Sequence, residues 1–185
     1  MIRGDHSYIR GTEQDDVEAL YGLYLQDMPR AGLLDVRREL LLPNRDELRD
    51  LLTRKEIADG SFYTVEDRRG AVVGFCSLRG HSVEAGFAEY ILHFVDLAHY
   101  RTPTAREAHA FLLNRAFTRL GLRKVMAHAL SVEDALRDFL VENQFQSAGV
   151  QRDVLFSGGV WHDLETLVLN NPAVQPEDCR DHDAA

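Results

Sequence analysis

The spacing of apolar residues changes from a helical to a strand-like period near residue 60, and this change constrains the fold more than any other feature. Over residues 13–28 the apolar side chains recur at every third or fourth position, which predicts an amphipathic helix. A second helix is predicted between the start signal at Pro43 and the stop at Gly60. Beyond that point the pattern predicts consecutive strands at 61–65, 71–78 and 87–96.

The second half of the chain alternates predicted helices with predicted strands. The elements are a long helix from about 103 to 120, a strand at 124–130, a helix at 132–143 and two strands at 150–156 and 160–169. With an opening strand at 7–11, this order predicts an α/β fold with a mixed (α+β) sheet of about seven mostly antiparallel strands, flanked by about four helices. One domain is expected over 1–169, and the acidic tail 170–185 is expected to be mobile.

The composition excludes several classes of protein. The chain has 185 residues, of which 45% are hydrophobic and 28% charged, the balance of a folded globular domain. No apolar run reaches the roughly 18–20 residues that span a bilayer, so no membrane association is expected. The start of the sequence lacks the apolar core of a secretory signal, and two cysteines are too few for a disulfide scaffold. A cytoplasmic location is therefore expected.

The charge of the chain is acidic overall but unevenly distributed. The formal net charge is −9, from 21 basic and 30 acidic side chains, which argues against nucleic-acid binding. The acidity either keeps the protein soluble or favours a cationic substrate by long-range attraction. Between residues 101 and 124, however, basic side chains predominate and Glu107 is the single acid. This segment is a candidate for binding an anion.

Four short motifs occur in the second half of the chain. Ala88-Glu89-Tyr90 opens the predicted strand 87–96, the run 116–125 joins the long helix to the next strand, and 144–149 and 159–163 lie around the closing strands. They resemble the AEF or AEI, aF..lgl.kv, GF..eG and nGk..D motifs of the GNAT acyltransferase superfamily. The resemblance is greatest to the ribosomal-protein alanine and spermidine N-acetyltransferases, and the order of elements extends it over nearly the whole chain.

The resemblance implies both a cleft and an activity. GNAT sheets splay at their centre, here between the strands 87–96 and 124–130, which leaves room for a pantetheine-like chain. GNAT acyltransferases move an acetyl group from acetyl-CoA, a co-substrate, directly to a primary amine of a small molecule or a peptide. The segment 30–43 would then border the acceptor pocket and decide substrate choice. The sequence leaves a homodimer open.

The coenzyme A site implied by the resemblance departs from the family pattern. GNAT proteins cradle the pyrophosphate with Q/R-x-x-G-x-G/A at the start of the long helix, where free N–H groups and the helix dipole face the anion. Residues 99–106 of this chain contain no glycine. The residues that can still bind the anion through amides, hydroxyls and charge are Arg101, Thr102, Thr104, Ala105 and Arg106. The alternative is a well-capped helix that binds nothing.

Three residues are the main candidates for the chemistry of acyl transfer. The acceptor amine must lose a proton, and Glu89 stands where GNAT proteins often keep the general base. His93, four residues on and on the same strand face, is the alternative base, directly or through water. Ser131, at the end of the strand 124–130, is a reserve acid together with His128. Each also has a structural interpretation, as a surface carboxylate, a packed histidine or a helix cap.

Two function hypotheses follow. The first is an acetyl-CoA-dependent N-acyltransferase, which Glu89 and the intact order of elements favour. The second is a GNAT-fold protein without acetyltransferase activity that serves as a ligand sensor or interaction module. The glycine-free segment favours the second, as does Leu140, which replaces a tyrosine that can protonate the leaving thiolate in many family members. The eight histidines form no compact metal-binding pattern such as HExxH, so no metal site is expected.

Overall fold

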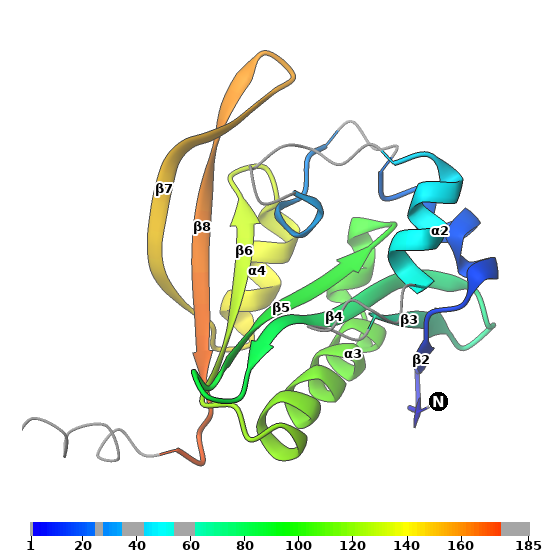
Figure 1. Cartoon of the computed structure of the whole chain (residues 1–185), viewed down its shortest axis with the longest axis horizontal. Helices are drawn as coiled ribbons and strands as arrows, with labels where there is room; N and C mark the ends of the chain where they lie inside the picture. Colours follow the sequence, from blue (N-terminus) through cyan, green and yellow to red (C-terminus); the bar gives the residue numbers. More distant parts are fainter. Residues whose placement is uncertain (1, 25–27, 35–42, 54–61, 175–185) are drawn as a thin grey trace, which may run out of the picture.

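A mixed sheet with helices on both faces forms the framework of the protein (Figure 1). The computed structural model describes residues 2–24, 28–34, 43–53 and 62–174. The end of the predicted tail, 175–185, and the segments 25–27, 35–42 and 54–61 lie outside the described residues. Just past residue 169, Asn171 is buried and its Nδ2 donates to the carbonyl of Leu122 at 2.9 Å. The α/β class predicted from the periodicity is confirmed.

The sheet has eight strands among the described residues, one more than expected. In their order across the sheet they are β1 (Ile2–Arg3), β2 (Ser7–Gly11), β3 (Phe62–Asp67), β4 (Val72–Ser82), β5 (Phe87–Phe94), β6 (Lys124–Leu130), β8 (Val160–Asn170) and β7 (Gln146–Ser157). Neighbouring strands are antiparallel except β5 and β6, which are parallel. The additional strand, β1, has only two residues and pairs with β2.

Helices cover both faces of this sheet. One face carries η1 (Gln14–Asp16), α1 (Val17–Tyr21), the 3-10 turn η2 (Ala31–Leu33) and α2 (Arg45–Thr53). The other carries the 3-10 helix η3 (Leu97–Arg101), α3 (Pro103–Leu113), its π-helical continuation η4 (Asn114–Arg119) and α4 (Asp134–Glu142). The predicted helix over 13–28 is shorter in the structure. The backbone tightens after Tyr21, where the N–H groups of Leu23 and Tyr24 bond three residues back, to Leu20 and Tyr21.

Small side chains bring α3 close to the sheet. Ala105, Ala108, Leu112 and Ala116 recur at helical spacing and are fully buried against the strands. The burial of Leu112 alone stabilises the fold by about 1.5–3 kcal/mol. This packing places the first turn of α3 beside the end of β5.

The N-terminal strands are tied to the same turn of α3. The carboxylate of Glu107 accepts hydrogen bonds from the His6 N–H at 2.9 Å and the Ser7 hydroxyl at 2.5 Å. Thr104 Oγ1 donates to the His6 carbonyl at 3.3 Å. Gly4 lies so close to the Glu107 carboxylate that a Cβ would overlap it. The single acid of the basic segment therefore anchors β1 and β2.

Candidate functional site

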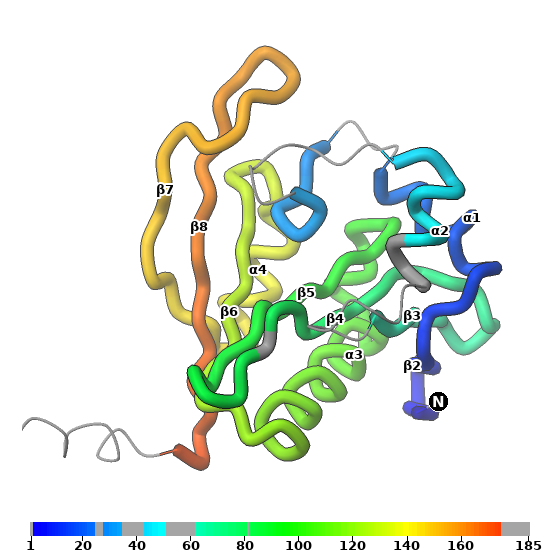
Figure 2. Tube along the Cα trace, viewed as in Figure 1, coloured from blue at the N-terminus to red at the C-terminus, as the bar shows by residue number. Residues whose placement is uncertain are grey.

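β5 and β6 separate after three paired residues, as the resemblance implies. Phe87–Glu89 pair with Lys124–Met126, and the pairing ends there. β5 stays paired with β4 as far as Phe94, and β6 stays paired with β8 as far as Leu130. Because each strand keeps its outer partner, the two diverge as a V, which is also visible in the Cα trace (Figure 2).

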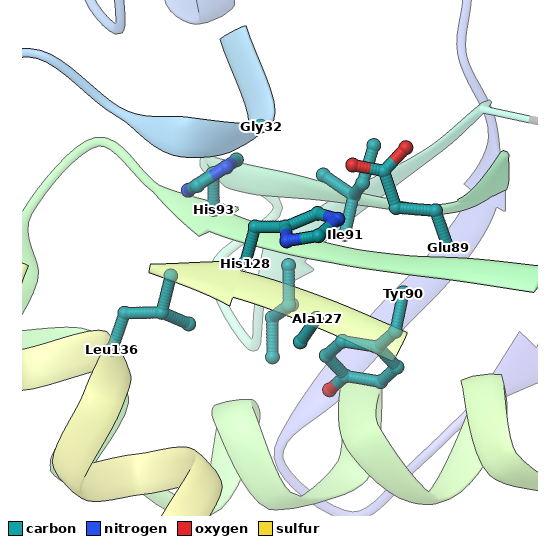
Figure 3. Close-up of a pocket in the computed structure, with 9 residues that line it drawn as sticks. Gly32, Glu89, Tyr90, Ile91, His93, Ala127, His128 and Leu136 are labelled. Carbon is teal, nitrogen blue, oxygen red and sulfur yellow. The ribbon is translucent and has the colours of Figure 1, made fainter. Parts of the chain in front are cut away.

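A small cavity lies within this V (Figure 3). Its volume is about 10 Å³, which is room for one water molecule. It is lined by Glu89, Tyr90, Ile91, Leu92 and His93 of β5, by Ala127 and His128 of β6, by Gly32 of η2 and by Leu136 of α4. Successive strand residues point to opposite faces, so the cavity touches both faces of the sheet. It brings together two of the main candidates, Glu89 and His93, with the reserve candidate His128.

Glu89 is held in a bidentate ion pair. Arg79, opposite it on β4, donates from Nε to one carboxylate oxygen at 2.7 Å and from Nη2 to the other at 2.8 Å. The Glu89 side chain is 20% exposed. Such a fork fixes both oxygens in one plane. Glu89 therefore presents an oriented, partly neutralised carboxylate to the cavity, and Arg79 is a site residue that the sequence prediction missed.

His93 is enclosed beside η2. It is 2% exposed, its ring centroid lies 5.8 Å from that of Phe75, and a Cβ on Gly32 would overlap its Nε2. Within the described ranges, its Nδ1 has no hydrogen-bond partner. Burial lowers the pKa of His93 to about 3, and the charges of Arg30 and Arg79 act in the same direction. His93 is therefore neutral at physiological pH.

A buried carboxylate anchors the segment that the resemblance assigns to the acceptor pocket. Glu133 accepts hydrogen bonds from the Leu130 N–H at 2.9 Å and the Ala31 N–H at 2.8 Å. Burial raises the pKa of Glu133 to about 7, although these bonds and the charge of Arg30 oppose the rise. Ala31 is thereby fixed beside the end of β6, whereas 35–42 of the same segment lie outside the described residues.

Ser131 lies away from the cavity. It is exposed just after β6, and its Oγ accepts a hydrogen bond from the Asp163 N–H at 3.3 Å. It lines a separate pocket of about 310 Å³, whose other polar lining residues are Asp134, Arg137, Asp163 and Glu165. The structure therefore does not bring Ser131 together with Glu89 and His93.

Two of the five predicted anion-binding residues line a pocket between α3 and α4. Arg101 and Arg106 are exposed, and the pocket that they border has a volume of about 320 Å³. Asp138 and Glu142 of α4 also line it. We call it the arginine pocket. Its two guanidinium groups suit a phosphate, whereas its two carboxylates repel one.

The other three predicted residues are engaged within the protein. Thr102 is the N-cap of α3, but its hydroxyl donates back to the His99 carbonyl at 2.7 Å. Thr104 and Ala105 are buried, and the Ala105 N–H donates to the Thr102 carbonyl at 3.2 Å. Their side chains are therefore not available to an anion in this structure, whereas Arg101 and Arg106 are exposed.

Tyr100 connects the arginine pocket to the cavity. It lines the pocket, and its hydroxyl donates to the carbonyl of Leu92, a cavity residue, at 2.8 Å. Its ring is 4% exposed and packs against Phe139 and Phe94, at centroid distances of 5.7 and 5.2 Å. The Tyr100 side chain is therefore fixed between β5 and α4.

Comparison with known proteins finds N-acetyltransferases. No family model matches the chain. The probable N-acetyltransferase YjcK of Bacillus subtilis (strain 168) is 26% identical over 185 residues, covering 93% of this chain and 98% of that protein. The spermidine N-acetyltransferase of Vibrio cholerae, solved with CoA and spermine, has a TM-score of 0.74 at 19% identity, covering 91% of this chain and 97% of its own.

A second structure of the Vibrio cholerae enzyme, a dodecamer in an intermediate state, has a TM-score of 0.71 at 20% identity, over 91% of this chain and 95% of its own. These likenesses extend over most of the chain and agree with the order of strands and helices. The GNAT-like fold predicted from the resemblance of the four motifs is thereby confirmed. Among the described residues, no helix is both long and apolar enough to cross a membrane.

Proposed function

We propose that the chain is an acetyl-CoA-dependent N-acetyltransferase of the GNAT superfamily, which moves the acetyl group directly to a primary amine. The observation that carries the proposal is the cavity in the V of the sheet. The side chains of Glu89, His93 and His128 line this cavity, which lies where the pairing of β5 with β6 ends. The similarity in sequence and fold to N-acetyltransferases supports it.

Acetyl-CoA is the proposed co-substrate, and the two parts of its site fit it unequally. The arginine pocket offers Arg101 and Arg106 to the phosphates, beside the first turn of α3 with Thr102, Thr104 and Ala105. The unpaired edge of β5 offers peptide groups to the pantetheine arm. The cavity, at about 10 Å³, is far smaller than that arm, so binding requires the side chains that line the cavity to move.

The proposed acceptor is a polyamine, and the proposed assembly is a homo-oligomer. The Vibrio cholerae neighbours, which were solved with spermine and as a dodecamer, support both parts. The net charge of −9 also favours a cationic acceptor. A peptide amine remains the alternative acceptor. The proposal includes a single domain over 1–169 and a cytoplasmic location, with which the free thiol of Cys76 agrees.

The function is tested by measuring free thiol release from acetyl-CoA in the presence of spermidine, spermine or a peptide amine. Gly32→Ala should lower the rate about 100-fold, because the new Cβ displaces His93 and distorts the cavity. Gly11→Ala is the matched control, since no atom lies within 4 Å of a Cβ there, and it should retain the parental rate. The proposal would be contradicted if none of the acceptors caused release of free thiol from acetyl-CoA.

A ligand sensor without acetyltransferase activity is the second candidate function. The small volume of the cavity, about 10 Å³, favours it, because a pantetheine arm does not fit there. A ligand that binds only the folded state must raise the melting temperature. A thermal shift with CoA together with no turnover would therefore support the sensor, whereas a thermal shift with turnover supports the enzyme.

A further inference from the structure

The 3-10 turn η2 lies in the open end of the V. In Figure 1 it is the light-blue turn between the diverging ends of β5 and β6. Two backbone hydrogen bonds, at 3.0 and 3.3 Å, join the N–H groups of Leu33 and Leu34 to carbonyls three residues back. A helical turn this short is not stable by itself. Contacts with the rest of the protein therefore hold η2 in place.

The two sides of η2 pack against the two arms of the V. On one side, Leu33 belongs to a cluster with Phe75 of β4 and Ile91 of β5. On the other side, Ala31 and Leu34 belong to a cluster with buried leucines of β6, β7 and β8, namely Leu130, Leu155 and Leu164. η2 therefore connects the arms in the region where β5 and β6 are no longer paired.

The contact of η2 with β5 is close enough to require a glycine. A Cβ on Gly32 would overlap Nε2 of His93 and would lie 3.2 Å from Cγ2 of Ile91. Figure 3 shows Gly32 directly beside the His93 ring, at the edge of the cavity that both residues line. The backbone of η2 is therefore a wall of the cavity on this side.

The contact of η2 with β6 is made by a carboxylate. Oε2 of Glu133 accepts hydrogen bonds from the Ala31 N–H at 2.8 Å and from the Leu130 N–H at 2.9 Å. Glu133 is 3% exposed and is the N-cap residue of α4. A carboxyl group is costly to bury unless its oxygens accept hydrogen bonds, and here one oxygen joins the first residue of η2 to the last residue of β6. We call this pair of bonds the Glu133 clasp.

The two substrates of the proposed reaction reach the V from different faces of the sheet. On β5, Ile91 packs in the cluster with η2, whereas Tyr90 and Leu92 pack in the cluster with α3. Because successive strand residues point to opposite faces, Glu89 and His93 point to the face of η2. The arginine pocket, which would hold the phosphates of CoA, lies between α3 and α4 on the other face. The face of η2 and Glu89 is therefore left for the amine.

On the basis of the proposed function, we infer that Glu133 is a positioning residue that sets the affinity for the amine acceptor, because its clasp holds η2 as the acceptor-side wall of the V. Without the clasp, Leu33 still attaches η2 to the β5 arm, but the backbone of Ala31 is no longer bonded to the β6 arm. The wall beside Gly32 and His93 then loses its fixed position. The arginine pocket does not include Glu133, so the affinity for acetyl-CoA is unaffected.

The test is a separate measurement of KM for each substrate in the thiol-release assay with the full-length chain. The amine is whichever of spermidine, spermine and a peptide amine gives the fastest release. Glu133→Ala should raise the amine KM about 5- to 20-fold and leave the acetyl-CoA KM within about 2-fold of the parental value. Glu133→Gln should restore the amine KM, because its single carbonyl oxygen can accept both N–H bonds.

Glu107→Ala is the matched control for the loss of a carboxylate that joins distant segments. Glu107 accepts a hydrogen bond from the His6 N–H, 101 residues away, and lines neither the cavity nor the arginine pocket. This variant should have a lower melting temperature and the parental amine KM.

A second variant breaks the clasp from the other side. Ala31→Pro removes the N–H donor and keeps Glu133, and proline suits the first position of a helical turn after an extended residue such as Arg30. It should raise the amine KM as Glu133→Ala does. In both variants, hydrogen exchange measured by mass spectrometry should become about 10-fold faster over residues 28–34, and in Glu133→Gln it should stay parental.

Three results would overturn the inference and leave the proposed function intact. They are a parental amine KM in folded Glu133→Ala, an equal rise of both KM values, and a rise in Glu133→Gln as large as in Glu133→Ala. If Glu133→Ala does not fold, the amine KM of Ala31→Pro decides in the same way. A parent chain that releases no thiol with any of the amines would overturn the inference together with the proposed function.

Discussion

Replacement of Tyr100 by phenylalanine should free the Leu92 carbonyl, a peptide group of β5 that the proposed pantetheine site would use. The substitution removes only the hydroxyl, which donates to the Leu92 carbonyl at 2.8 Å, and keeps the ring contacts with Phe94 and Phe139. A neutral hydrogen bond of this kind contributes about 0.5–1.5 kcal/mol net. Because CoA has to break this hydrogen bond in the parent before it can use the Leu92 carbonyl, the variant avoids this cost. The affinity for CoA should rise about 2- to 13-fold.

The assay is calorimetric titration with CoA at constant pH and salt. Tyr100→Phe should lose stability by the same amount, about 0.5–1.5 kcal/mol, while binding CoA more tightly than the parent. An unchanged or weaker CoA affinity in a folded Tyr100→Phe variant would refute the proposal that CoA uses the Leu92 carbonyl.

Replacing Arg101 and Arg106 together by alanine should weaken CoA binding by about 1–3 kcal/mol, the scale of charge-assisted hydrogen bonds; a calorimetric affinity equal to the parent's would place the phosphates elsewhere. The free energy of unfolding should fall as the pH drops below 6.5, because burial lowers the pKa of His93 to about 3 and of His109 to about 4, and only the unfolded chain binds these protons. Urea titrations between pH 7 and 4 measure this, and a flat profile would count against it. Glu133 has the opposite effect on the free energy of unfolding. Burial raises its pKa from 4.5 to about 7, so the stability that the protonated side chain contributes is lost as the pH rises through 7. Glu133→Gln should remove that loss in the same titrations between pH 5 and 8.

Local patterns predict the framework because each strand or helix is encoded within a short window. The alternation over 87–96 and 124–130 predicts two strands, and the resemblance places the splay between them, where pairing does stop after Glu89. The first helix shows the limit of this reasoning. Its apolar spacing predicts a helix over 13–28, but the backbone tightens after Tyr21, and Leu23 is still buried in the tightened turn.

The contacts that complete the site join segments far apart in the chain, and no periodicity reports them. Ala31 and Glu133 are 102 residues apart, and His128 and Thr166 are 38 apart. The pair of Arg79 and Glu89 is closer, at ten residues, but its register depends on the irregularity that follows Arg79 in the hairpin. Glu89 and His93 could be identified as cavity residues from their strand, whereas the ion pair and the burial that govern their chemistry could not.

In the proposed reaction, an acetyl group passes from acetyl-CoA to an amine at the V of the sheet. The most direct test of this transfer is mass spectrometry of the products after incubation of the full-length chain with isotopically labelled acetyl-CoA and spermidine, alongside measurement of free thiol. We expect one labelled acetyl group on the amine for each thiol released, with none left on the protein, and loss of this product in Gly32→Ala but not in Gly11→Ala. The proposed transfer would be contradicted if acetyl-CoA remained intact after incubation with the folded protein and every amine tried.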